Sequence, residues 1–92
     1  MDVQVTVGPD EDTESVKRFL RDLTRECTNF LHEPDQIYIV LNLKLLVHTN
    51  NIDAVIIGHQ AGVLGWGLDE ITCSSPDHVA FNAHLDLSEV PF

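Results

Sequence analysis

One amphipathic stretch constrains the fold of this chain more than any other part of its sequence. Between residues 16 and 31 the apolar side chains recur three or four residues apart, which is the spacing of one face of an α-helix. They are Val16, Phe19, Leu20, Leu23, Cys27, Phe30 and Leu31. Pro34 cannot donate a main-chain hydrogen bond and it restricts the residue before it, so the helix is predicted to stop there. Asp10 or Asp12 is the expected cap at its start.

Alternation of apolar and polar residues predicts strands on both sides of this helix. Residues 3–7 place valine at every second position, which is typical of a short strand with one buried face. From Ile37 to His48 every odd position is apolar, and this predicts one long strand. Thr49, Asn50 and Asn51 follow as a turn, because asparagine suits tight turns.

The second half of the chain predicts three further strands. Residues 52–57 are mostly apolar and rich in β-branched side chains, so we interpret them as a strand. Their apolar spacing also fits a short helix, which is the alternative. Residues 63–71 and 79–87 are the other two predicted strands, and residues 58–62 and 72–77 are the predicted loops.

This order of elements predicts an α+β fold in which residues 1–92 form a single compact domain. One amphipathic helix would pack on a four- to five-stranded, mainly antiparallel sheet in the order β-α-β-β-β-β. Consecutive strands joined by short turns must be antiparallel, which is why we expect that arrangement. The last strand, residues 79–87, is expected at an exposed sheet edge, where a homodimer would be compatible with the sequence.

The charge of the chain is strongly negative and unevenly distributed. Fifteen Asp and Glu residues against five Lys and Arg residues leave a formal net charge of −10, and no Lys or Arg follows Lys44. Direct binding of nucleic acid and of anionic membranes is therefore disfavoured, because both depend on basic residues. A basic protein partner is favoured. The chain shows no secretory leader and no long apolar run, so we expect a cytoplasmic protein.

The leading hypothesis is a non-enzymatic acidic domain that binds protein. It would act as an inhibitor that occupies a basic site on a nuclease, a toxin or a nucleic-acid-binding protein, and in its sharpest form it would mimic nucleic acid. No cofactor is expected. The candidate partner-binding residues are Asp53, Trp66, Asp69, Glu70, Asp77, Asp86 and Glu89. Trp66 is included because tryptophan is common at interface hot spots, although a core anchor is the alternative for it.

Two other hypotheses remain open at this stage. Asn82, His84 and Asp86 share one face of the predicted last strand, with His48 on a neighbouring strand. Such a set could bind a metal ion or support hydrolysis, whereas a solvated polar strand face is the simpler interpretation because no close-spaced ligand set occurs. The acidity could also be an adaptation to a salty cytoplasm, which would make the function unrelated to charge.

Overall fold

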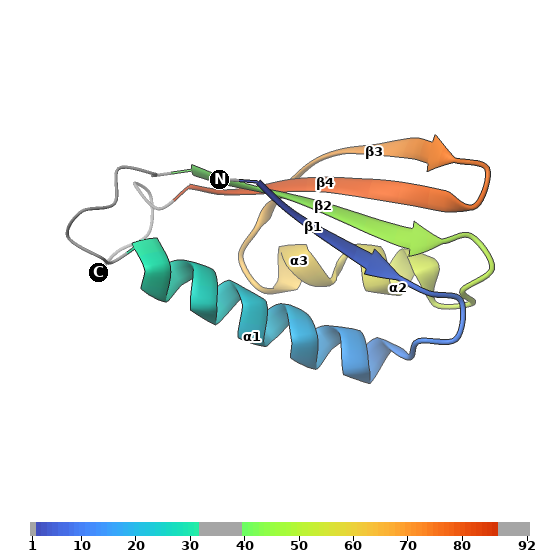
Figure 1. Cartoon of the computed structure of the whole chain (residues 1–92), viewed down its shortest axis with the longest axis horizontal. Coiled ribbons are helices and arrows are strands. Elements are labelled where there is room, and N and C mark those ends of the chain that lie inside the picture. The colour runs from blue at the N-terminus through green and yellow to red at the C-terminus, as the bar shows by residue number, and fades with distance from the viewer. Residues whose placement is uncertain (1, 32–39, 87–92) are drawn as a thin grey trace.

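The computed structural model describes residues 2–31 and 40–86, and it has an α+β architecture with the helices on one face of a sheet (Figure 1). The predicted fold class and the amphipathic helix are therefore confirmed. The elements are β1 (Asp2–Val7), α1 (Thr13–Leu31), β2 (Val40–His48), α2 (Ala54–Gly58), α3 (Gln60–Val63), β3 (Gly67–Ser75) and β4 (His78–Asp86). The predicted strand residues 37–39 lie outside the described part of the chain.

The sheet is mixed, and the order of its four strands is β1-β2-β4-β3. β1 pairs with β2 in parallel, whereas β4 is antiparallel to both β2 and β3. The expected element order and the mainly antiparallel sheet roughly fit, but the prediction of a single helix does not. The described residues form three helices and four strands. Both parallel relations, of β1 to β2 and of β2 to β3, need crossover connections, and the helices supply them.

The strand predicted for residues 52–57 is wrong, and the alternative of a helix is correct. α2 occupies most of this segment, because the chain must cross from the end of β2 to the start of β3 at the opposite end of the sheet. Ile57, on the inner side of α2, is fully buried. The β-branched residues fit either structure locally, so the crossover decides between them.

β3 begins later and ends later than the sequence predicts. Val63 belongs to α3, and the chain then reverses at Gly65, whose φ of 102° is accessible to glycine without strain. The main-chain N–H of Trp66 donates to the carbonyl of Ala61 at 3.0 Å, and that of Gly65 donates to Gly62 at 3.1 Å. These two bonds form a Schellman cap, which ends α3 and sets the start of β3. The predicted loop 72–77 shrinks to a two-residue turn.

The last strand is not at an edge, contrary to the prediction for residues 79–87. β4 lies between β2 and β3, so the edges of the described sheet are β1 and β3. The hairpin of β3 and β4 places β4 beside β2 in the middle of the sheet, and no local sequence pattern indicates the pairing of β4 with β2. β4 therefore offers no free edge through which the expected homodimer could form.

The core lies between the helices and the inner face of the sheet. Leu41, Leu43, Leu45 and Val47 of β2 point into it, as their alternation predicts. Cys27 of α1 is buried beside them, and its burial raises the pKa of its thiol. Within residues 2–31 and 40–86, no helix has the length and apolar character that crossing a bilayer requires.

Candidate functional site

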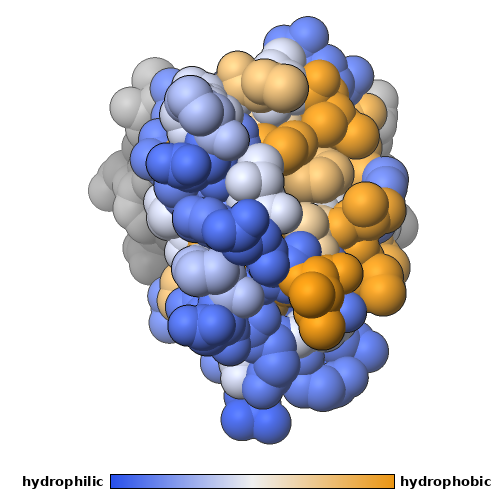
Figure 2. All heavy atoms as spheres, turned by 90° about the vertical axis from the view of Figure 1, so that its right-hand side faces the viewer, coloured by the Kyte–Doolittle hydropathy of each residue, from blue (hydrophilic) through white to orange (hydrophobic). Residues whose placement is uncertain are grey.

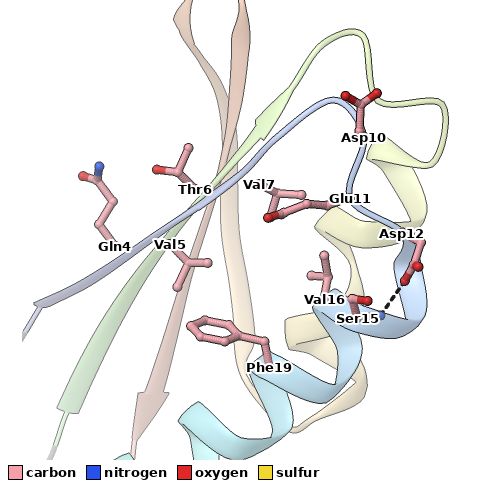
Figure 3. A pocket seen from close by; sticks show the side chains of 10 residues that line it. All are labelled: Gln4, Val5, Thr6, Val7, Asp10, Glu11, Asp12, Ser15, Val16 and Phe19. Atoms are coloured by element: carbon pink, nitrogen blue, oxygen red, sulfur yellow. Dashed lines mark hydrogen bonds between the residues drawn. The ribbon is translucent and has the colours of Figure 1, made fainter.

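A groove of about 670 Å³ runs between the edge strand β1 and the first turns of α1 (Figure 3). Its floor and its rim have different chemistry: the floor is apolar and one end of the rim is acidic. The groove is lined by Gln4, Val5, Thr6, Val7, Asp10, Glu11, Asp12, Ser15, Val16 and Phe19. None of these ten residues is Lys, Arg or His.

The floor of the groove is formed by valines of β1 and by apolar residues of α1. Val5 points from the sheet toward Phe19, whereas Gln4 and Thr6 point to the opposite side of β1 (Figure 3). Phe19 belongs to the predicted apolar face of α1, yet 54% of its surface is exposed. An aromatic ring left open beside a strand edge offers a surface on which another apolar side chain can pack.

The main chain of β1 forms the long side of the groove. β1 pairs in unbroken register with β2, from Asp2 opposite Asn42 to Val7 opposite Val47. In a parallel pair, alternate residues direct their N–H and C=O groups away from the partner strand, so β1 presents a row of such groups at its outer side. β3, the other edge, has two register shifts in its pairing with β4, and irregularities of this kind discourage the addition of a strand.

Three consecutive acidic residues form the rim where β1 turns into α1. The carboxylate of Glu11 accepts a hydrogen bond from the main-chain N–H of Gly8 at 3.3 Å, and that of Asp12 accepts one from Ser15 at 2.7 Å. The Ser15 bond is the cap predicted at the start of α1, and it lowers the pKa of Asp12. Asp10 stands exposed at the outer end of the groove (Figure 3).

The Asp12 cap gives a testable pH dependence. Because its pKa is lower in the folded chain than its ordinary value of 3.8, the cap stabilises the fold fully above that value. The contribution is lost as pH falls through the lower, folded-state pKa. We expect Asp12→Ala to reduce the midpoint of thermal unfolding at pH 7, and we expect this difference to shrink below about pH 4. A difference that persists unchanged at pH 2 would contradict the assignment.

Asn51 fixes the loop that carries this acidic rim. It is only 5% exposed, and its amide donates to the carbonyls of Gly8 and Glu11, both at 2.9 Å. Its side-chain oxygen accepts from the main-chain N–H of Asp53 at 2.9 Å. A buried amide with three partners holds two distant segments in one geometry. Asn51 thus ties the loop after β1 to the turn after β2.

The predicted partner-binding carboxylates do not form one surface in the structure. Asp53 and Asp77 lie in turns at one end of the sheet, where the Asp77 carbonyl accepts a hydrogen bond from Thr49. Asp69 and Asp86 lie near the other end, beside the last residues of β4. At about 3.3 Å per strand residue, the two groups are more than about 20 Å apart. Glu70 is exposed on β3, and Glu89 lies outside the described residues.

Trp66 is a core residue. It is 4% exposed, and its indole N–H donates to the hydroxyl of Thr24 at 2.8 Å. That hydroxyl in turn donates to the carbonyl of Leu20 on α1 at 2.8 Å. The alternative of a core anchor therefore describes Trp66, and its buried ring is not presented to a partner in this structure.

The histidine cluster proposed from the last strand is only partly assembled. Asn82 and His84 do lie on the open face of the sheet, and His84 Nδ1 lies 2.8 Å from a carboxylate oxygen of Asp69. His48 stands at the far end of that face against His78, with the two rings 5.1 Å apart. Residues 2–31 and 40–86 contain no group of three potential metal ligands. The open face is therefore a polar surface whose side chains form hydrogen bonds between neighbouring strands.

The groove residues Asp10 and Glu11 are absent from the set predicted by sequence. The sequence predicts only a capping role for Asp10, and negative charge at a helix N-terminus is the ordinary interpretation of Glu11. The available signal was the run Asp10-Glu11-Asp12 placed directly after an alternating strand. That signal is weak, because only the sheet order reveals that the strand is an edge.

Comparison of this chain with protein-family models, with curated proteins and with solved structures gives no match.

Proposed function

We propose that this domain binds an extended, basic segment of a partner protein in the groove beside β1. The observation that carries the proposal is the unbroken edge of β1, which lies over an apolar floor and leads to an acidic rim. An incoming strand would add to the sheet through main-chain hydrogen bonds, while alternate side chains would meet the groove.

The charge of the rim argues for a basic occupant. Asp10, Glu11 and Asp12 lie at one end of the groove, and none of the ten lining residues is a cation. Arg18 of α1, outside the groove, is the cation that acts on Asp12. A Lys or Arg side chain on the bound segment would meet these carboxylates, and its apolar neighbours would pack near Phe19. The net charge of −10 would also accelerate the encounter with a basic protein.

A synthetic peptide of alternating lysine and valine is a suitable probe. We expect it to bind with shifts of the backbone amide NMR signals of β1, and we expect affinity, measured by fluorescence anisotropy, to fall as salt rises. The paired change Asp10→Asn and Glu11→Gln keeps the Asp12 cap and should weaken binding roughly 2- to 30-fold. A peptide methylated at alternate main-chain nitrogens should lose binding, because it cannot pair with a strand edge.

The matched control is Asp69→Asn with Glu70→Gln, which also removes two carboxylates but from the opposite edge of the sheet. This pair should leave peptide affinity within about two-fold. If it weakens binding as much as the groove pair does, the acidic surface of the second half is the binding site and the groove is not. Equal binding of a glutamate–valine peptide would also refute the proposal.

A further inference from the structure

A second exposed surface is apolar, and it differs in this from the groove with its acidic rim. It consists of side chains that precede α2, lie on α2 and α3, or lie on the neighbouring strand β3. They are Ile52, Val55, Ile56, Val63, Leu68 and Ile71, and we call this set the apolar stripe. Their exposed fractions range from 39% for Leu68 to 97% for Ile52. Figure 2 shows hydrophobic side chains gathered on one side of the molecule, next to a hydrophilic half.

The helical part of the stripe reverses what a surface helix normally shows. Val55 and Ile56 lie on the outer side of α2 and Val63 on that of α3, and all three are exposed. Ile57, Gly58 and Ala61 fall on the other side and are buried. A surface helix normally carries polar residues outward, and a helix that is apolar all round is normally covered on both sides.

Most of the stripe lies in a segment of the chain that has no charged residues. No Asp, Glu, Lys or Arg occurs from residue 54 to residue 68, the longest such stretch in a sequence with a net charge of −10. Depletion of charged residues is the compositional signal of an interface core. Asp53 and Asp69 flank this stretch in the sequence.

The area of the stripe approaches what a dimer of this size needs. Aliphatic side chains bury roughly 60–120 Å² each, so the six partly exposed side chains offer roughly 230–460 Å² of apolar surface. A standard interface buries about 800 Å² per partner, of which about 450–500 Å² is apolar. Two stripes facing each other would therefore reach the lower end of the standard size.

We propose that two copies of this chain associate through their apolar stripes around a two-fold axis. A second copy is the occupant that the area and the charge favour, because each stripe meets an uncharged surface of the same extent. The net charge of −10 on each copy opposes association. Dimerisation should therefore tighten as salt rises, whereas binding of a basic segment in the β1 groove should weaken.

Analytical ultracentrifugation of the whole chain tests this proposal. We expect a monomer–dimer equilibrium with a dissociation constant in the micromolar range, and at least about three-fold tighter association at about 0.5 M salt than at about 0.02 M. The variant Val55→Gln with Val63→Gln adds no charge and changes two exposed positions, so it should fold normally and associate at least about ten-fold more weakly. Concentration-dependent amide shifts should map to residues 52–63 and 68–71.

The matched control is Phe19→Gln, which removes an exposed apolar side chain from the groove. It should leave the dimer unchanged, with circular dichroism and thermal unfolding as the check on folding. Loss of the dimer in this variant would place self-association in the groove and overturn the proposal. A monomer at about millimolar concentration in every salt would also overturn it and assign the stripe to a different partner.

Discussion

Replacing Asn51 by alanine is expected to lower the free energy of unfolding by about 2–4 kcal/mol. The change leaves the carbonyls of Gly8 and Glu11 without the buried amide that donates to both of them. It also frees the loop that carries the acidic rim, so affinity for the lysine–valine peptide should fall together with stability. Urea denaturation, followed by the fluorescence of the single tryptophan Trp66, measures the first effect.

Two variants make this prediction specific. Asn51→Asp has nearly the same size but cannot donate, so it should destabilise the chain at least as much as Asn51→Ala. Asn50→Ala changes the exposed neighbour and should stay within about 0.5 kcal/mol of the parent chain. If Asn51→Ala were as mild as Asn50→Ala, the loop would not depend on the buried amide.

Replacing Gly58 by alanine is expected to lower the free energy of unfolding by about 1–3 kcal/mol. Gly58 is buried at the end of α2, and a methyl group there would overlap the ring of Phe81. Phe81 is itself buried and packs edge-on against His59, so its ring has little room to move. Urea denaturation is again the measurement.

Gly62→Ala is the matched control for this prediction. A methyl group at Gly62 would meet only Leu68, at an ordinary contact distance of 3.5 Å. Because alanine favours the helix over glycine, this variant should be more stable than the parent chain by about 0.5–1 kcal/mol. Helix propensity alone predicts the same sign at both glycines. Stabilisation by Gly58→Ala would therefore show that Phe81 yields easily and that packing does not decide the outcome there.

Local patterns of the sequence were sufficient for β1, α1 and most of β2. Each of these elements has a single period of apolar residues. Residues 52–57 lack such a signal, because β-branched side chains at helical spacing satisfy both periods. The requirement for a crossover between two parallel strands resolved them as a helix, and that requirement exists only once the sheet order is known.

The candidate site was less predictable than the fold. The sequence indicated an acidic protein-binding domain, but it pointed to carboxylates that the fold distributes over both ends of the sheet. Asp10 and Glu11 become candidate binding residues because they lie beside an edge strand. Trp66 is no longer a candidate, because it is buried against Thr24. Edge position and burial are properties of the whole fold, so neither can be predicted from the residues that are neighbours in the sequence.

By itself, the sequence determined the net charge, the amphipathic helix and the alternating strands, because these depend on residues close together in the chain. The tertiary structure alone decided which strand forms the open edge and which glycine faces an aromatic ring. It also decided that the uncharged segment from residue 54 to residue 68 turns aliphatic side chains outward. These features arise from contacts between segments far apart in sequence, where packing and strand pairing outweigh local preference.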